Sequence, residues 1–474
     1  MAQNLLAGSW VGSDRVETVI SPWSNQPLDE VPLASADQVD QALSLAERSL
    51  EVTRGLPPWR RAEILSRASA LITERADDLS VTLSAEAAKP IDYARGEVGR
   101  CAETFRFAAE ELRCARGEAI PMDVTSRGSN KWGVTRRFPV GVVSAITPFN
   151  FPLNLVAHKV APAIAAGCPV VLKPANKTPL TAFNLAAIVL EAGWPPEALS
   201  VLNMDITEAG LLVTDPRPRL LTFTGSAAVG WALKTRAGKK RVILELGGDA
   251  AVIVGSEVDD WDGMVRRIAF GAFAYAGQVC ISVQRVLVPH DQLERLRDDL
   301  LAVLPEEVRV GAPDQTGVTM SALIDDHAVD KVRAFVDEAE ARGAQRLSGG
   351  YREGRVFDPM VFTGVSPESR LGCEEVFGPV VSLQGYQSYQ EALDEVNRSA
   401  YGLQTGLYTT RQEEITRAFN ELEVGALMVN EVPTWRVDHM PYGGVKDSGF
   451  GREGLRYAYE EYTEERMLVL PAPW

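Results

Sequence analysis

The stretch VGVVSAITPFNFPLNLVAHKVAPAIAAGCPVVLKPA, residues 140–175, decides the fold of this chain. Its β-branched run Val140–Ile146 predicts a strand, Leu153–Ala166 predicts a helix, and Val170–Leu172 predicts a second strand. Strand and helix alternating at this spacing are typical of a parallel, doubly wound sheet. Sheets of this kind bind ligands at the carboxyl ends of their strands.

The same alternation continues on the C-terminal side. The expected elements are helices at Thr181–Ala192 and Ala227–Arg236 and strands at Leu199–Asn203, Leu220–Phe223 and Arg241–Glu245. On the N-terminal side, Ser35 and Gln38 form a capping-box pattern that starts a run of helices reaching to about residue 115. A second α/β stretch is expected from about residue 250 to 430. The predicted fold class is therefore α/β.

Two strand-like regions fall outside this alternation. Residues 119–143 contain two or three short strands with polar faces and a turn near Gly128 and Ser129. Near the C-terminus, Arg466–Leu470 predicts a further strand. A polar ribbon of this kind is equally typical of a surface hairpin and of a strand between subunits.

The composition argues against several classes of function. The formal net charge of −16 argues against nucleic acid or an anionic membrane surface as a partner. We expect no membrane span, no signal peptide and a cytoplasmic location, because the sequence lacks a long apolar stretch and a basic leader. The five cysteines form no CxxC pair and the four histidines no ligand-like pair, so we expect neither a disulfide framework nor a metal site.

Two turns at strand ends indicate a nucleotide site, although no GxGxxG motif opens a helix. One strand ends at Lys173, and another leads through Gly225 and Ser226 into a helix. A helix N-terminus with free N–H groups favours an anion such as pyrophosphate, and Gly230 allows that helix to pack closely. Each turn alone is also typical of an ordinary surface loop.

Three residues are candidates for covalent catalysis. Cys280 follows a helix-like segment at Val265–Ala276, Glu245 ends a predicted buried strand, and Asn150 lies just past another. A thiol nucleophile needs a base and a donor for the developing oxyanion, and these residue types supply both. Each also has an ordinary structural explanation: packing for the thiol, a cap or ion pair for the carboxylate, and a turn for the asparagine.

Eight segments, taken together and in order, resemble the aldehyde dehydrogenase superfamily over essentially the whole chain. They are TPFNFPLNL (147–155), GCPVVLKPA (167–175), FTGSAAVG (223–230), LELGG (244–248), GQVC (277–280), EEVFGPV (374–380), YGLQTGLYT (401–409) and MPYGGVKDSGFGREG (440–454). The resemblance implies a Rossmann-like cofactor domain, an α/β catalytic domain and oligomerisation strands, and therefore a homodimer or homotetramer. The corresponding ranges are 1–118, 141–248 and 431–454 for the cofactor domain, 249–430 for the catalytic domain, and 119–140 and 455–474 for the strands.

The resemblance also implies a reaction, the NAD(P)-dependent oxidation of an aldehyde to a carboxylic acid. Cys280 matches the nucleophile that forms a thioester, and Asn150 with the Cys280 backbone N–H matches the oxyanion hole. Glu245 matches the base that activates water to hydrolyse the thioester, and Lys446 matches a residue at the cofactor end of the site.

For the cofactor, the resemblance places Lys173 at a ribose, Ser226 at the pyrophosphate, and Glu375 and Phe377 at the nicotinamide ribose and ring. The other implied contacts are Ile146, Thr147, Phe149, Asn176, Gly225, Gly230 and Leu246. Many NAD-specific members carry a glutamate where this chain has Asn176, and a carboxylate there would repel a 2′-phosphate. We therefore expect the cofactor to be NAD or NADP, with NADP tolerated.

For the substrate, the resemblance favours a small, hydroxylated or anionic aldehyde, as in the lactaldehyde, glyceraldehyde and phosphonoacetaldehyde subgroup. Phe151, Val279, Ile281 and Phe450 match lining positions, and Arg100 and Arg436 are candidates to bind a polar tail. Arg436 could instead form an ion pair with Asp438, and His158 is interpreted as a hydrogen-bonded core residue. Non-phosphorylating glyceraldehyde-phosphate dehydrogenases carry an arginine where this chain has Val279.

Two other functions are compatible with parts of this pattern. A coenzyme A-acylating semialdehyde dehydrogenase would keep the fold, but such enzymes commonly lack a base at the position of Glu245. A catalytically silent structural or binding member of the family would be expected to have lost Cys280, Glu245 or Asn150, and this chain retains all three.

Overall fold

A mixed, mainly parallel sheet with helices on both faces lies at the centre of the larger part of the protein. The computed structural model describes residues 2–114 and 117–471. In spatial order, the eight strands of this sheet are β2 (Ser9–Val11), β1 (Asn4–Leu6), β9 (Leu199–Val201), β8 (Val170–Lys173), β7 (Val142–Ile146), β10 (Pro218–Thr224), β11 (Arg241–Glu245) and β21 (Gly449–Phe450). The five strands from β9 to β11 are parallel, and the strand order reverses between β7 and β10. A crevice at the carboxyl ends of strands at such a reversal is the usual ligand site of this architecture.

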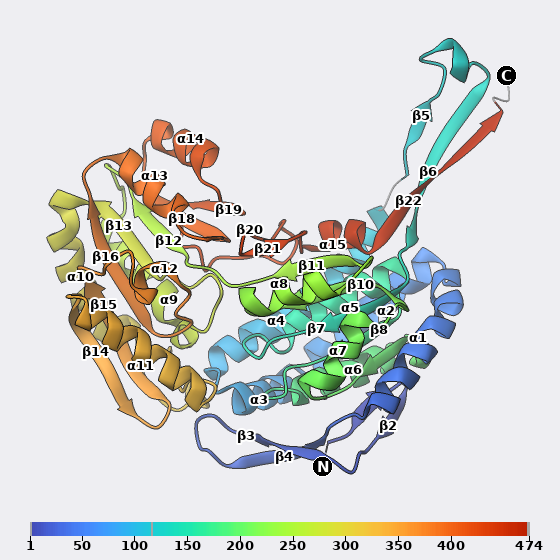
Figure 1. Ribbon diagram of the computed structural model, residues 1–474, viewed down its shortest axis with the longest axis horizontal. Coiled ribbons are helices and arrows are strands. Elements are labelled where there is room, and N and C mark those ends of the chain that lie inside the picture. Colours follow the sequence, from blue (N-terminus) through green and yellow to red (C-terminus); the bar gives the residue numbers. More distant parts are fainter. Residues whose placement is uncertain (1, 115–116, 472–474) are drawn as a thin grey trace.

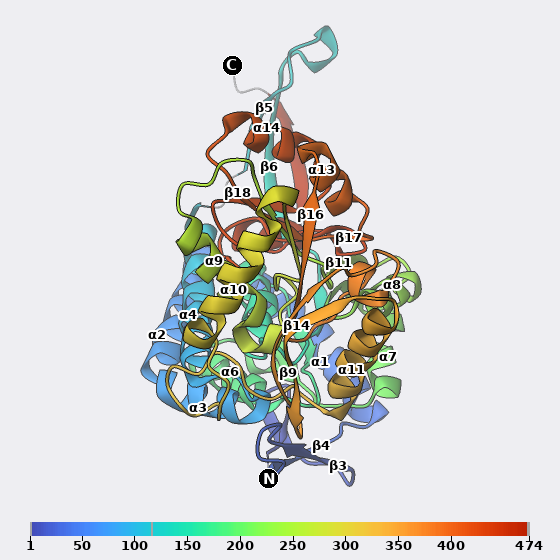
Figure 2. The same cartoon turned by 90° about the vertical axis from the view of Figure 1, so that its left-hand side faces the viewer.

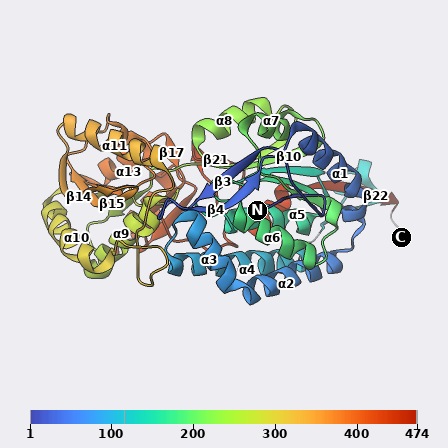
Figure 3. The same cartoon turned by 90° about the horizontal axis from the view of Figure 1, so that it is seen from below.

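Helices cover both faces of this sheet (Figure 3). One face carries α2 (Pro58–Glu74), α3 (Ala76–Ala87), α4 (Ile91–Cys114), α5 (Asn154–Ala166) and α6 (Leu180–Glu191), and the other carries α1 (Ala36–Gly55), α7 (Ile206–Thr214) and α8 (Ala227–Arg236). Helix α5 is buried along its whole length, as expected for a helix between a sheet and an outer helical layer. Buried apolar side chains between these layers form the cores on which the sheet depends.

A second α/β body follows in the chain and lies beside the first (Figures 1 and 3). Its seven strands are, in order, β14 (Gln345–Glu353), β15 (Val356–Thr363), β16 (Val380–Tyr386), β13 (Arg285–Pro289), β12 (Ala251–Val254), β18 (Gln404–Tyr408) and β19 (Ala426–Val429). Helices α9 (Trp261–Phe273), α10 (Leu293–Glu307) and α11 (Asp326–Ala341) pack on one face, and α13 (Tyr389–Asn397) and α14 (Gln412–Glu421) pack on the other.

A three-stranded ribbon projects from the first body (Figures 1 and 2). It consists of β5 (Ala119–Pro121), β6 (Lys131–Pro139) and β22 (Thr463–Pro471), all antiparallel. A separate hairpin of β3 (Val16–Ile20) and β4 (Pro27–Pro32) lies at the opposite end of the molecule. Within residues 2–114 and 117–471, no helix is both long enough and apolar enough to cross a membrane.

The predicted fold class is confirmed, with small differences at the ends of elements. Helix Ala227–Arg236 and strand Arg241–Glu245 have the predicted bounds, and Ser35 and Gln38 form the predicted capping box. The helix predicted to reach Ala276 ends at Phe273, because the next residues have left-handed backbone conformations. The exact division of the chain into domains stays a prediction.

Candidate active site

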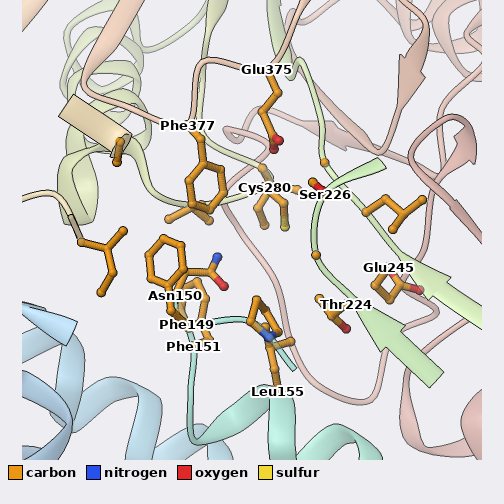
Figure 4. A pocket seen from close by; sticks show the side chains of 18 of the residues that line it. Phe149, Asn150, Phe151, Leu155, Thr224, Ser226, Glu245, Cys280, Glu375 and Phe377 are labelled. Atoms are coloured by element: carbon orange, nitrogen blue, oxygen red, sulfur yellow. The ribbon is translucent and has the colours of Figure 1, made fainter. Parts of the chain in front are cut away.

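A cavity of about 440 Å³ lies where the two bodies meet (Figure 4). Its wall combines residues from the carboxyl ends of strands in the first body with loops of the second. Fourteen of the predicted site residues line it: Arg100, Phe149, Asn150, Phe151, Gly225, Ser226, Glu245, Leu246, Val279, Cys280, Ile281, Glu375, Phe377 and Arg436. Cysteine, asparagine and carboxylate side chains therefore share one enclosed space.

The loop that carries the thiol, residues 274–280, has an unusual backbone. Tyr275, Ala276 and Gly277 all have positive φ values, of 51°, 54° and 69°. A Cβ at Gly277 would collide with the carbonyl oxygen of Gly378, so both the conformation and the close approach require glycine there. Such backbone strain persists only where surrounding contacts enforce it, and it occurs most often at functional sites. We refer to this segment as the thiol loop.

The side chain of Gln278 fixes the thiol loop from within. Its amide oxygen accepts a hydrogen bond of 2.9 Å from the Ile324 backbone N–H, and its amide nitrogen lies 3.4 Å from the Tyr275 carbonyl oxygen. The Tyr275 hydroxyl donates to the carbonyl oxygen of Ala87, at 3.0 Å, across the junction of the two bodies. Neutral hydrogen bonds thus hold this loop in its strained shape.

Cys280 contacts the hydroxyl of Tyr442, a residue that sequence reasoning did not identify, and Arg436 packs against the Tyr442 ring. The Cys280 Sγ lies 3.1 Å from the Tyr442 hydroxyl, and the Arg436 guanidinium stacks 3.6 Å from the centre of the Tyr442 ring. Burial raises the pKa of the Cys280 thiol to about 11, while the Tyr442 hydrogen bond and the Arg436 charge act in the opposite direction. The thiol is therefore protonated at neutral pH in the protein alone, and forming the thiolate requires a proton acceptor or an added positive charge.

Asn150 lies on a second loop, residues 147–153, which follows β7; we refer to it as the asparagine loop. The Asn150 amide nitrogen donates to the backbone carbonyl of Gln278, at 3.1 Å, and so joins this loop to the thiol loop. An amide nitrogen carries two protons, so one donor remains beside Cys280. In Figure 4 the Asn150 amide and the Cys280 sulfur lie in the same space.

A buried ion pair of Glu97 and Lys89 positions the asparagine loop. Glu97, on α4, accepts hydrogen bonds of 3.0 Å from the backbone N–H groups of Leu153 and Asn154, the first free donors of α5. Its other oxygen pairs with Lys89, and both side chains are almost fully buried. The Lys89 ammonium lies 3.7 Å from the centre of the Phe151 ring, and Phe151 lines the cavity. A cation and a carboxylate thus position the loop that carries Asn150.

Glu245 ends β11 and is 3% exposed. Neither of its carboxylate oxygens has a hydrogen-bond partner within the described part of the chain. Burial raises the pKa of this carboxyl well above its ordinary value, and the negative charge of Glu453 acts in the same direction. Buried polar groups without protein partners usually hold water or act on a ligand, so this carboxyl has the environment of a general base.

The opposite part of the cavity has the features of a dinucleotide site. Ser226 is the N-cap of α8, yet its hydroxyl forms no capping bond within the helix, so the group and the helix N-terminus are both available. Glu375 accepts a 3.0 Å hydrogen bond from the Gly248 N–H and is fixed beside the LELGG segment. Phe377 packs edge-to-face on Phe149, with ring centres 5.9 Å apart.

Six predicted residues do not line the cavity. Ile146 and Lys173 end neighbouring strands in register, and Thr147 follows Ile146. Gly230 is required by packing, since a Cβ there would collide with Leu246, a cavity residue. Asn176 lies one residue from Lys177, which does line the cavity. These five positions surround the site.

The sixth, Phe450, was predicted as a lining residue and does not belong to the cavity wall. Phe450 is 48% exposed on the edge strand β21, where it packs under the Lys234 ammonium. Lys446 does not line the cavity either: its half-buried ammonium donates to the carbonyl oxygens of Asn397 and Ser399. Lys446 lies on β20 (Val445–Lys446), which pairs with β17 (Tyr401–Gly402), whereas Phe450 lies on β21 at the edge of the eight-stranded sheet.

The two arginines have partners that differ from expectation. Asp438 pairs with Arg100 through two hydrogen bonds of 2.7 and 3.0 Å, and it also bonds His158 at 2.8 Å, as expected for a core histidine. Arg436 pairs instead with Glu453, at 3.3 Å, so the alternative ion pair with Asp438 is not formed. The Arg436 Nε has no hydrogen-bond partner within the described part of the chain, although it is buried.

Sequence reasoning missed other residues of the cavity wall. They are Pro148, Asn154, Leu155, Thr224, Gly247, Ile324, Asp325, His327, Ala328, Lys331, Thr434 and Tyr442. Several of them lie within or next to the quoted family segments, but no sequence pattern shows which side chains of a loop face inward. Across residues 2–114 and 117–471, no group of three or more histidine, cysteine or acidic side chains could hold a metal ion.

Comparison with known proteins identifies the family. The model of the aldehyde dehydrogenase family matches residues 10–468. The chain is 40% identical over 464 residues to the 3-sulfolactaldehyde dehydrogenase of Priestia aryabhattai, covering 98% of this chain and 96% of that one. It superposes with a TM-score of 0.97 on aldehyde dehydrogenase 21 from Physcomitrella patens in complex with the reaction product succinate, at 39% identity, covering 100% of this chain and 98% of that chain.

A second solved structure also matches this chain over almost its whole length. The NADP-dependent glyceraldehyde-3-phosphate dehydrogenase from Bacillus halodurans, complexed with NADP, superposes with a TM-score of 0.96 at 32% identity and 99% coverage of each chain. Family model, sequence relatives and structures agree over the full length, and the thiol, amide and carboxylate lie together in one cavity. The chain belongs to the aldehyde dehydrogenase family.

Proposed function

We propose that this aldehyde dehydrogenase oxidises a small aldehyde with an anionic group to the carboxylic acid, using NAD or NADP. The observation that carries the substrate class is that Arg100 and Arg436 line the same cavity as Cys280. The names of the compared proteins support it, because the product in one is succinate and the substrate named in another carries a sulfonate. A further compared structure holds NADP, which supports the cofactor.

In the first half of the proposed reaction, the Cys280 sulfur adds to the aldehyde carbon and the thiol proton is released. The Asn150 amide and the Cys280 backbone N–H donate to the resulting oxyanion. When bound, the nicotinamide accepts the hydride from that carbon, which leaves a thioester on Cys280. Burial raises the Cys280 pKa to about 11, so the thiolate is the minor form at neutral pH.

In the second half, Glu245 takes a proton from water as the water attacks the thioester carbon. The carbon–sulfur bond breaks, the acid leaves, and the sulfur regains a proton. The raised pKa and unpartnered oxygens of Glu245 suit this role. A coenzyme A-acylating reaction would need no such base, and formation of acyl-coenzyme A when coenzyme A is added would favour that alternative.

The residues of the cleft fit a dinucleotide. The α8 N-terminus with Ser226 and Gly225 would hold the pyrophosphate, and Glu375 and Phe377 would hold the nicotinamide half. Gly225 matters for the close approach, because a Cβ there would press against the Phe223 ring. Lys173 and Asn176 would lie at the adenosine half.

The anionic group of the substrate would bind at the arginines. The guanidinium of Arg436 is buried, charged and partly unpartnered, and a carboxylate or sulfonate would supply the missing acceptor. Arg100 keeps 30% of its side chain exposed while paired with Asp438, so it would form the outer edge of the binding site. Val279 and Ile281 would pack against a short carbon skeleton.

The test compares anionic with neutral aldehydes of equal length, for example succinic semialdehyde with butanal. We expect Arg436→Gln to raise KM for the anionic substrate by about 10- to 100-fold, because the substrate loses a charge-assisted hydrogen bond. KM for the neutral aldehyde should stay nearly unchanged. Arg297→Gln, at a half-buried arginine that is paired with Asp298 and lies outside the cavity wall, is the matched control. Equal changes in KM for both substrates would contradict an anionic substrate.

Two further expectations stay predictions. These are a homodimer or homotetramer built through the ribbon of β5, β6 and β22, and a cytoplasmic location.

A further inference from the structure

A carboxylate from the N-terminal hairpin reaches the adenosine end of the cleft. Glu17 lies on β3, far from the cleft in sequence, and its Oε2 accepts a 2.8 Å hydrogen bond from the Asn176 amide nitrogen. The Asn176 amide oxygen in turn accepts a 2.5 Å hydrogen bond from the Lys173 ammonium. A hydrogen-bonded row of lysine, asparagine and glutamate therefore extends outward from the end of β8.

The pleat of β3 directs Glu17 inward. Val16, Thr18 and Ile20 are exposed, whereas Val19 is buried and Glu17 is half-buried on the same face. Glu17 pairs across the hairpin with the buried Val31. Its neighbour Glu30 pairs with Thr18 and is exposed on the other face. The pleat of the hairpin thus places Glu17 on the inner face and Glu30 on the solvent-facing side.

The position of this row within the sheet indicates which part of a dinucleotide it would meet. Lys173 ends β8 in register with Ile146 at the end of β7, beside the reversal of strand order between β7 and β10. A dinucleotide whose pyrophosphate lies at the α8 N-terminus extends its adenosine over the strands on one side of that reversal. The cavity wall continues to Lys177, next to Asn176. The row therefore lies at the adenosine ribose.

Charges around this ribose position are of both signs. Lys173 is the buried cation, and burial lowers its pKa to about 8 while Glu17 and Asp205 act to raise it. Asp205 is itself paired with Arg15, so much of its charge is neutralised by that partner. Glu17 is the carboxylate bonded to Asn176, and its charge would lie beside a 2′-substituent of the ribose.

We propose that Glu17 is a cofactor-specificity residue, which binds the adenosine ribose together with Asn176 and disfavours a 2′-phosphate. It supplies from the hairpin the carboxylate that position 176 lacks. NADP is still accepted, because the Asn176 amide stands between the Glu17 carboxylate and Lys173, where a carboxylate at position 176 would bond the lysine directly, but NAD binds more tightly. This inference rests on the proposed use of a nicotinamide dinucleotide.

The test measures the dissociation constants of NAD and NADP by calorimetry, together with those of 5′-AMP and adenosine 2′,5′-bisphosphate, which differ only in the 2′-phosphate. Glu17→Gln removes the charge but can still accept the Asn176 hydrogen bond. We expect the ratio of NADP to NAD affinity to rise by about tenfold in this variant, and the affinity ratio of adenosine 2′,5′-bisphosphate to 5′-AMP to rise in parallel. Glu17→Ala, which also removes the hydrogen bond, should weaken NAD binding as well.

Glu30→Gln, on the same hairpin but facing solvent, is the control and should leave both ratios at the wild-type value. Unchanged ratios in Glu17→Gln and Glu17→Ala, with both nucleotides still bound, would overturn this inference and leave the proposed function intact. Failure of the wild-type protein to bind either nucleotide would overturn the proposed function and the inference with it.

Discussion

The two loops that meet at the cavity are held by different kinds of interaction. The asparagine loop rests on a buried ion pair, Glu97 with Lys89, whereas the thiol loop is held by the neutral amide of Gln278. The asparagine loop has an ordinary backbone and must be positioned from outside. The thiol loop has three successive left-handed residues, so its own backbone already specifies its shape.

This difference separates two requirements of the site. The Gln278 side chain holds the thiol loop in a fixed conformation through neutral hydrogen bonds. Charged groups place the asparagine loop, and the same Lys89 ammonium also lies 4.6 Å from the centre of the Tyr275 ring on the thiol loop. The single amide hydrogen bond from Asn150 to the Gln278 carbonyl joins the two loops across the junction of the bodies.

The largest expected effect comes from breaking the charged support. Glu97→Gln should keep the hydrogen bonds to Leu153 and Asn154 but leave the buried Lys89 without a counter-charge, which costs about 3–5 kcal/mol of stability. Urea unfolding measures this loss. The double variant Glu97→Gln with Lys89→Met removes both charges and should recover most of it. A single variant as stable as the wild type would show that the ion pair does not support the loop.

The next effect tests the amide that joins the loops. Asn150→Ala removes the oxyanion donor and should lower kcat by about 100- to 1000-fold, as expected for one preorganised donor. Single-turnover NADH formation measures the chemical step directly. Asn203, buried elsewhere in the first body, offers a matched position: Asn203→Ala should lower stability without a specific loss in the chemical step. Equal kinetic losses in the two variants would contradict the assigned role.

A smaller effect is expected from weakening the neutral support. Gln278→Met preserves volume but leaves the Ile324 N–H without its acceptor, at a cost of about 1–3 kcal/mol. Because the thiol loop would relax, we also expect kcat to fall by about tenfold or more. Gln412→Met, at an exposed position, is the control. Full activity in Gln278→Met would show that the left-handed backbone alone fixes the loop.

The smallest effect concerns the pH dependence of the thiol. Because the Cys280 pKa is raised to about 11, the thiolate fraction and the alkylation rate of the free protein should increase with pH up to that region. Tyr442→Phe removes a hydrogen bond that lowers this pKa, so alkylation by iodoacetamide at pH 8 should slow by about three- to tenfold. Faster alkylation of the Tyr442→Phe variant would show that Tyr442 raises the pKa of Cys280 and would contradict this prediction.

The main elements could be predicted because their sequence signals are local. The strand Arg241–Glu245 and the helix Ala227–Arg236 follow from short-range patterns, and the parallel sheet then brings Asn150, Ser226 and Glu245 to one edge. The shared cavity of Asn150, Glu245 and Cys280 could be expected from the family resemblance. The geometry of this cavity could not be predicted from the sequence, because it depends on the contact between two separate bodies.

The supports of the site depend on long-range contacts and could not be predicted. Glu97 contacts a loop 56 residues away, and Tyr442 reaches a thiol 162 residues away. The partner of Arg436 is Glu453, although Asp438 is only two residues from it in sequence, because Asp438 is already bonded to Arg100 and His158. Which carboxylate pairs with a buried arginine depends on burial and on competing partners, and both are determined only in the folded chain.

The most direct test of the account traps the thioester. Glu245→Gln, mixed with NAD and an anionic aldehyde, should release about one equivalent of NADH and then stop. Mass spectrometry of the digested protein should find the acyl group on the Cys280 peptide and on no other cysteine peptide. NADH release without an acyl group on Cys280, or continued turnover at the wild-type rate, would contradict a thioester on Cys280 that Glu245 hydrolyses.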